Sequence, residues 1–230
     1  SGDDNVGDDA LRPKSRWACA LRYLRSLNQT NRGDQIWLMP NHAETIRLAA
    51  AIPMNVEGVS VFGMSKGASR PHITFESDTA ASILISAVNC TILNVVGIAG
   101  IAGLTQPFDV TANDCILGIE WQDTSTSLSA ARAVLATSVS RLQVELASRG
   151  FRSGGQVVNA IRLVDCTHAD INLDAFGVNS TAWVEMASTL SSNVFVRGKM
   201  YTDGYTDGAH NVVDSTGGSY WGAELFDLSM

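Results

Sequence analysis

The chain has 230 residues, enough for one domain or two, and 45% of them are hydrophobic, enough for a large buried core. Its net charge of −7 and its lack of a Lys/Arg-rich run argue against a nucleic-acid-binding protein. Because no apolar run approaches the roughly 18 residues of a membrane-spanning helix, we expect no membrane partner either.

The chain begins with a polar, acidic segment, residues 1–11, in which we expect a flexible arm. Residues 12–30 are predicted to contain a helix. Pro13 suits its first turn, and apolar residues recur at steps of three and four from Trp17 to Leu27. A stack of strands ends in an open edge and an exposed core. We therefore expect this helix to cap the N-terminal end of such a stack.

Short apolar strands separated by turns follow, within a region, residues 31–200, that we predict to be a parallel β-helix. The first strands are expected at 36–39, 44–48, 56–62 and 72–75, with a surface loop at 63–71. An apolar-x-apolar pair then recurs with a period of about 25 residues. The pairs are Leu93/Val95, Leu117/Ile119, Leu142/Val144, Ile171/Leu173 and Val194/Val196. Their steps of 24, 25, 29 and 23 residues are typical of a coil that stacks on itself.

A second apolar series lies between these pairs, so each coil holds at least two strands. Its members are Leu84, Phe108, Val134, Ile161 and Trp183. Alternation of apolar and polar residues indicates strands, and a stack buries a continuous core that one coil cannot bury alone. The predicted fold class is therefore all-β, a right-handed parallel β-helix (solenoid) with an N-terminal capping helix. The hand follows the strong preference of parallel crossovers.

The four cysteines, Cys19, Cys90, Cys115 and Cys166, lack the spacing of a zinc site and are too sparse for a disulfide framework. The last three lie at or just before repeat strands. We interpret them as buried free thiols that act as small core residues.

The pattern changes at residues 201–230, which begin with a tandem Tyr-Thr-Asp-Gly that indicates consecutive turns. Many large apolar side chains follow: Tyr220, Trp221, Leu225, Phe226 and Leu228. We expect this segment to cover the open C-terminal end of the stack and to dock on another subunit. These large apolar residues are the candidate interface.

Three stretches, in order along the chain, resemble the opening of a known family. They are 33–46 (GDQIWLMPNHAETI), 56–64 (VEGVSVFGM) and 69–75 (SRPHITF). The family comprises right-handed β-helix proteins of pectate-lyase-like fold among the structural proteins of tailed phages. Asn41 departs from its pattern, which has Gly there, although Asn also tolerates a left-handed turn. The resemblance implies the fold and a virion context, and it does not imply an enzyme.

The acidic residues are the first candidates for a catalytic site. Glycosidases need two carboxylates about 5 to 10 Å apart, and neighbouring coils lie about 4.8 Å apart. Glu120, Glu145 and Asp174 are candidates, because each follows a repeat pair at a roughly equivalent place. An acidic outer face explains them more simply, so we predict no catalytic residue.

A metal site at Asp203, Asp207 and His210 is a further alternative. Their Asp-Gly steps are typical of turns, so we predict no metal site. The sequence also lacks a Gly-rich phosphate loop between a strand and a helix, and we expect no cofactor.

These features favour a structural protein over an enzyme. The expected function is that of a non-enzymatic phage virion protein, a capsid decoration or cement protein on the head surface. We expect it to form a homo-oligomer, a trimer, and to contact the major capsid protein. The alternative is a tail-spike or tail-fibre module that binds or cleaves host polysaccharide. A third hypothesis is a secreted, lyase-like carbohydrate-binding protein.

Overall fold

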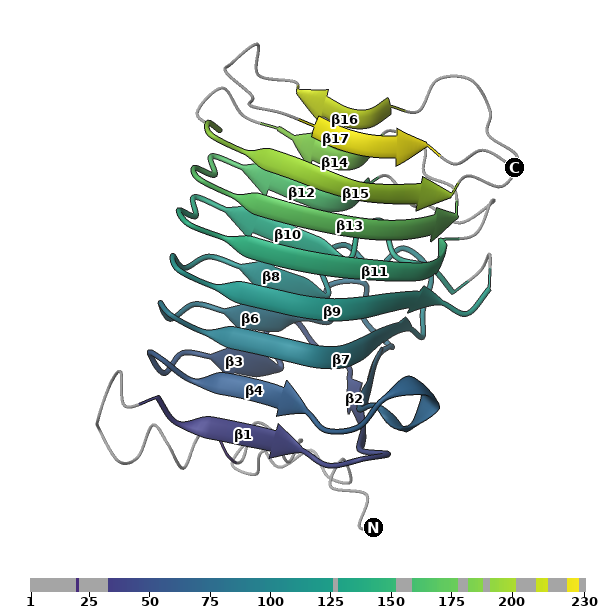
Figure 1. Ribbon diagram of the computed structural model, residues 1–230. Helices are drawn as coiled ribbons and strands as arrows, with labels where there is room; N and C mark the ends of the chain where they lie inside the picture. The colour runs from purple at the N-terminus through teal and green to yellow at the C-terminus, as the bar shows by residue number, and fades with distance from the viewer. Residues whose placement is uncertain are drawn as a thin grey trace.

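The computed structural model describes residue 20 and residues 33–125, 128–151, 159–177, 182–187, 191–201, 210–214 and 223–227. They form one parallel β-solenoid of about six turns (Figure 1). Each strand pairs in parallel with a strand of an adjacent turn. The predicted all-β fold, a parallel β-helix, is confirmed.

The described strands form a larger and a smaller sheet that face each other across the core. The larger sheet contains β1 (Gln35–Leu38), β4 (Ser60–Gly63), β7 (Thr91–Ala99), β9 (Ile116–Asp123), β11 (Gln143–Phe151), β13 (Asp170–Gly177), β15 (Phe195–Tyr201) and β17 (Ala223–Asp227), with β2 (Ala43–Ile46) and β5 (His72–Phe75) beside it. The smaller sheet contains β3 (Ile52–Met54), β6 (Ile83–Ile85), β8 (Phe108–Val110), β10 (Val134–Thr137), β12 (Asn159–Val164), β14 (Ala182–Met186) and β16 (His210–Asp214). Pro53 lies in β3, at the edge of the smaller sheet, where a strand tolerates the missing N–H.

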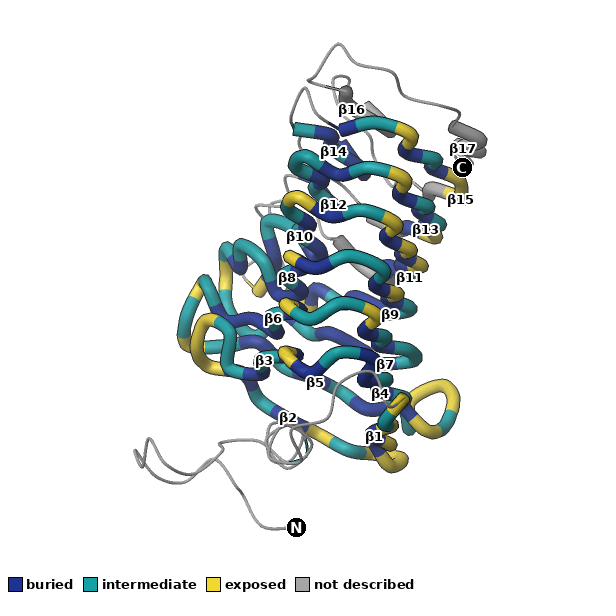
Figure 2. The backbone as a smooth tube through the Cα atoms, turned by 90° about the vertical axis from the view of Figure 1, so that its left-hand side faces the viewer, coloured by how far each residue is buried: buried dark blue, intermediate teal, exposed yellow. Residues whose placement is uncertain are grey.

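The core is built from columns of apolar side chains, one from each turn. The best-aligned column of the larger sheet is Ile36, Val61, Ile92, Leu117, Val144, Ile171 and Val196. All of these side chains are buried. Figure 2 shows buried segments along the strands and exposed ones at the corners between them.

The predicted register was wrong at several strands. The sequence period predicts Leu93 as the repeat residue of β7, but Ile92 aligns with Leu117 and Leu93 faces outward. Leu142 and Val194 precede β11 and β15, and both are buried at the corner before the strand. Corner and strand positions are thus equally apolar, so the period alone does not distinguish them. In the smaller sheet the column likewise passes through Ile83 and Val184, next to the predicted Leu84 and Trp183.

One corner of each turn is made by a residue in the left-handed conformation. In successive turns these are Asn89, Asp114, Arg141, His168 and Asn193, with φ between 53° and 59°. The backbone N–H groups of the first four donate to the next turn, as from Asn89 to Asn113 and from Asp114 to Ser140. Asp114 also accepts from Arg141 across this corner. The stacked corners therefore add inter-turn hydrogen bonds to those of the sheets.

Cys90, Cys115 and Cys166 are buried free thiols, as predicted, and Cys19 lies outside the described residues. Cys90 Sγ donates to the carbonyl oxygen of Val56 at 3.4 Å. Burial raises the pKa of Cys90 to about 12 and that of Cys115 to about 11, so both stay protonated at neutral pH.

The predicted terminal segments lie mostly outside the described residues. This holds for the arm at 1–11 and for the capping helix at 12–30, of which only Ala20 is described. Ala20 is in helical conformation and packs against the core, and the other described residues contain no α-helical element. Of the candidate interface, Tyr220, Trp221 and Leu228 lie outside the described residues, as do the side chains of Leu225 and Phe226 in β17.

Candidate functional site

The candidate site lies on the outer face of the larger sheet, at the corner where β4 meets β5. These strands are joined by a loop, 64–71, that contains the short 3-10 helix η1 (Gly67–Ser69). In the following turn one continuous strand, β7, replaces the strand-loop-strand unit. The first half of β7 pairs with β4 and its second half pairs with β5. Between these two halves of β7, the single residue Asn94 takes the place of the loop. It forms a β-bulge and has a φ of 61°.

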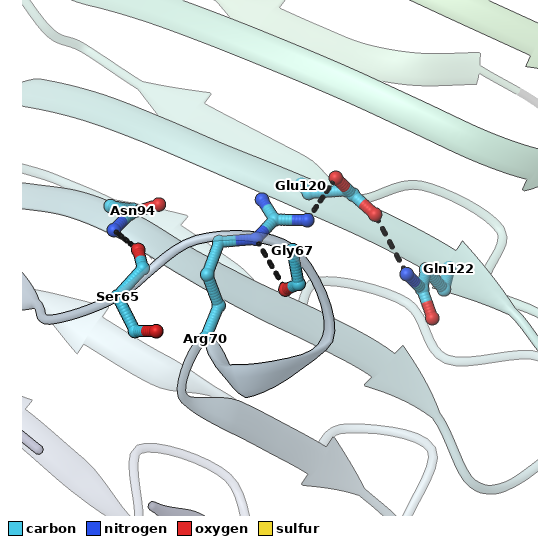
Figure 3. A network of polar contacts seen from close by, with 6 residues as sticks. All are labelled: Ser65, Gly67, Arg70, Asn94, Glu120 and Gln122. Atoms are coloured by element: carbon cyan, nitrogen blue, oxygen red, sulfur yellow. Dashed lines mark hydrogen bonds and ion pairs between the residues drawn. The ribbon is translucent and has the colours of Figure 1, made fainter. Parts of the chain in front are cut away.

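Asn94 holds the loop against the sheet. Its side-chain Nδ2 donates to the carbonyl oxygens of Gly63, at 2.6 Å, and of Ser65, at 2.9 Å (the latter bond is drawn in Figure 3). Asn suits this place because it tolerates left-handed backbone and carries two amide donors. One side chain thus fixes the direction in which the loop leaves β4.

The far end of the loop is fixed by an ion pair. Arg70 Nη2 donates to Glu120 Oε2 at 2.5 Å, and Gln122 Nε2 donates to Glu120 Oε1 at 2.7 Å (Figure 3). The Glu120 side chain is 4% exposed, so its charge depends on Arg70 for compensation. Both oxygens of this candidate acid are therefore engaged: Oε2 holds the loop on β9, and Oε1 accepts from a side chain of β9 itself.

The three candidate acids lie in two columns rather than one. Glu120 pairs with Ala147 and Ala147 with Asp174, so Glu120 and Asp174 lie two turns apart, roughly 10 Å along the stack. Glu145 pairs with Gly118 in the neighbouring column. The expected equivalence is right for Glu120 and Asp174 and wrong for Glu145, because Leu142 lies at the corner before β11 and Ala147 is the partner of Glu120.

Two adjoining depressions open on this face, with volumes of about 310 and 140 Å³. Both are lined by Leu93, Gly118 and Glu145, so they form one groove, which we call the Gly118 groove. Gly118 lies at its floor and contributes no side chain there. The larger depression is also lined by Arg70 and the smaller by Arg197, so the groove runs along the stack.

The charges that line the Gly118 groove are paired except at its centre. Arg70 pairs with Glu120, and Arg197 Nη2 lies 3.3 Å from Asp170 Oδ2. The Glu145 side chain is exposed and makes no hydrogen bond or ion pair with any residue that the structure describes. Among its described lining residues, the groove thus carries one uncompensated negative charge.

An apolar surface adjoins the groove at the N-terminal end of the same face. Trp37, Phe62 and Leu93 pair in one outward-facing column, and the ring centroids of Trp37 and Phe62 lie 5.1 Å apart. Met39 and Met64 follow β1 and β4 directly. Trp37 is 53% exposed and Met39 63%. We call Trp37, Met39, Phe62 and Met64 the apolar end.

The metal site considered from the sequence finds no counterpart among the described residues. The part of the chain that the structure describes contains no group of three His, Cys, Asp or Glu residues placed to hold a metal ion. Asp203 and Asp207 lie outside that part, as does the side chain of His210. In the same part, no helix is both long and apolar enough to cross a membrane.

Comparisons of this chain with protein-family models, with curated proteins and with solved structures found no match. The resemblance to phage β-helix proteins therefore rests on the sequence motifs, and the structure adds the parallel β-solenoid.

Proposed function

We propose that the chain is a non-enzymatic structural protein of a phage virion, a decoration or cement protein that forms a homotrimer on the head and contacts the major capsid protein. The sequence motifs supply the virion context. The parallel solenoid is consistent with the right-handed, pectate-lyase-like coil that they imply. The observation that carries the proposal is the apolar end, because such a surface on a regular sheet gains stability when an interface removes it from water.

Burial of the apolar end in an interface would contribute several kcal/mol to the free energy of association, at about 1.5–3 kcal/mol for each large apolar side chain that passes from full exposure to full burial. Trp37 and Met39 are each more than half exposed. Trp37 and Phe62 are carried by paired strands, so little conformational entropy is lost when a partner docks on them.

The acids also favour a structural role. Glu120 is bound to Arg70 and Gln122, which makes it a poor general base or nucleophile. Glu145 and Asp174 lie in different columns of different turns. They are diagonal neighbours on adjacent strands, roughly 8 Å apart by strand geometry, so the case against a catalytic pair rests on the engagement of Glu120.

The solution mass tests this proposal, alone and with undecorated phage capsids. We expect about three times the chain mass of 24.5 kDa and saturation of the capsids at a fixed ratio. A trimer that ignores capsids would remove the head location from the proposal. A monomer that binds no capsid would overturn it.

A matched pair of substitutions tests the apolar end. Trp37→Ser removes its largest side chain, and we expect it to weaken trimer formation. Leu48→Ser is the control, because Leu48 is 52% exposed, close to the 53% of Trp37, but lies beyond β2 and off this face. Light scattering across a dilution series measures both. Equal dissociation of the two variants would show that the apolar end is not the interface.

A tail-spike module that binds or cleaves host polysaccharide is the second candidate. The observation that favours it is the Gly118 groove, whose polar lining includes Gln143, Asn172 and Asp170. Incubation with purified capsule or lipopolysaccharide, followed by an assay for new reducing ends, distinguishes it from the first candidate. Release of reducing ends would favour the tail spike.

A further inference from the structure

We infer that the Gly118 groove is a docking site for a basic side chain, Lys or Arg, carried by an extended segment of a partner protein. The inference names the contact by which the proposed structural protein holds its partner, and so it rests on the proposed function. It is drawn from the shape, the walls and the charge of the groove.

The walls suit an aliphatic stem. Leu93 and Ile116 line the groove, and Ile116 is 38% exposed although it is a large apolar residue. Leu93 covers part of the floor, since a Cβ at position 118 would lie 2.7 Å from Leu93 Cδ2. Lys and Arg pack their methylene stems on such apolar surfaces while the charged head reaches polar groups.

The charge suits a cationic head. The carboxylate of Glu145 lines both depressions and has no partner among the described residues. Nearby, Asp170 Oδ1 is buried and makes no hydrogen bond in the described part of the chain. Arg70 and Arg197 are already paired with carboxylates, so they offer little to an anion. A charge-assisted hydrogen bond from a Lys or Arg head to Glu145 compensates the negative charge of this carboxylate.

The same charge argues against a second copy of this chain as the occupant. The outward column through the groove reads Leu93, Gly118, Glu145, Asn172 and Arg197. Two copies packed in parallel on this column would place Glu145 against Glu145, and like charges in an interface oppose binding. The chain as a whole also carries a net charge of −7, which favours a basic partner.

The test uses the full chain and a short probe peptide, acetyl-Gly-Leu-Lys-Leu-Gly-amide, with the same peptide bearing Nε-acetyl-lysine as its uncharged match. Binding is followed by NMR chemical-shift changes of the protein amides. We expect the shifts to concentrate in β7, β9 and β11 and to require severalfold higher concentrations of the acetylated peptide. Glu145→Gln should raise the dissociation constant of the peptide about threefold to fivefold, the effect of losing one exposed ion pair.

Two further variants separate charge from shape. Asp174→Asn removes an exposed carboxylate of the same sheet that lies outside the groove, and binding should not change. Gly118→Val fills the floor without altering charge, and binding should be lost while the fold, read from the amide spectrum, is kept. Equal binding by Glu145→Gln and the wild type would overturn the inference, as would shifts caused by an oligosaccharide probe such as maltoheptaose but not by the peptide.

Failure of this inference and failure of the proposed function are distinguishable. If capsids are saturated equally by the wild type and by Glu145→Gln, the structural role stands and the groove is not the docking site. If the peptide binds at Glu145 but no capsid is decorated, the groove stands and the head location falls.

Discussion

At the scale of single residues, Gly97 shows how tightly the core is filled. It lies in β7, opposite Trp121 of the next turn. A Cβ at this position would lie 2.7 Å from two carbons of the Trp121 ring and 3.0 Å from Phe108 Cε2. Trp121 is fully buried and packs against Phe75 and Phe108, with ring centroids 5.8 and 6.5 Å away. The ring therefore has no free space into which it could move.

Gly97→Ala is accordingly expected to lower the free energy of unfolding by about 1–3 kcal/mol, the usual cost of overpacking a core. Gly118→Ala is the matched control in the same sheet. Its Cβ would meet only Leu93, at 2.7 Å from the mobile Cδ2, and the expected change is below about 0.5 kcal/mol. Urea unfolding measures both variants, and equal losses of stability would contradict this account of the core.

At the scale of elements, Asp123 ties the end of β9 to the segment that leads to β10. Its Oδ1 accepts from Trp121 Nε1 at 2.9 Å and from the backbone N–H of Ala130 at 3.1 Å. Burial raises the pKa of Asp123 to about 6, although both hydrogen bonds favour the charged form. Its Oδ2 is buried and makes no hydrogen bond in the described part of the chain.

This raised pKa makes stability depend on pH in a definite direction. The pKa of Asp123 in the folded protein, about 6, lies above the ordinary value of 3.8, so the folded state binds the proton more tightly than the unfolded chain. Protonation therefore stabilises the fold, and this contribution is lost as the pH rises through about 6. The shift corresponds to on the order of 3 kcal/mol.

Asp123→Asn isolates this effect, because the Asn side-chain oxygen still accepts from Trp121 and Ala130 but no longer titrates. We expect the unfolding free energy of the wild type, minus that of the variant, to increase as the pH falls from about 8 to about 4. Urea titrations at several pH values measure this difference. Asp174→Asn, an exposed carboxylate, should show no such trend. Parallel curves for Asp123→Asn and the wild type would refute the assignment.

The elements also show where prediction from the sequence succeeds. The repeat of about 25 residues predicts most of the strands between residues 83 and 200, because every turn of a solenoid must supply the same inward columns. The same pattern does not predict the exact register of each strand, since corner residues such as Leu142 and Val194 are buried like strand residues. The period repeats, but it does not tell a corner from a strand.

The candidate site was harder to predict for a related reason. Arg70 and Glu120 are 50 positions apart, and they meet only because the loop 64–71 folds over the following turn. The Gly118 groove depends on which residues share a column, and a shifted register hides it. Asn94 is the residue with a visible signal, because a polar residue that interrupts the apolar run of β7 is typical of a bulge.

At the scale of the whole molecule, the stability of each turn depends on the turns next to it in the stack. A solenoid is held by contacts between neighbouring turns, so an inner turn has a partner on each side and an end turn has one. Among the described strands, β9 pairs with both β7 and β11, whereas β1 pairs with β4 alone. The backbone groups on the other edge of β1 have no strand partner in this part of the chain.

Hydrogen exchange tests this gradient together with the proposed assembly. We expect the amides of β7, β9 and β11 to exchange most slowly and those of β1 to exchange faster, because opening an end turn breaks one inter-turn interface rather than two. If the apolar end is an interface, β1 is protected further in the trimer, and Trp37→Ser removes that added protection while leaving β9 unchanged. Equal protection of β1 and β9 in the Trp37→Ser variant would contradict the turn-by-turn gradient. Equal protection of β1 in the variant and the wild type would place the interface elsewhere on the stack.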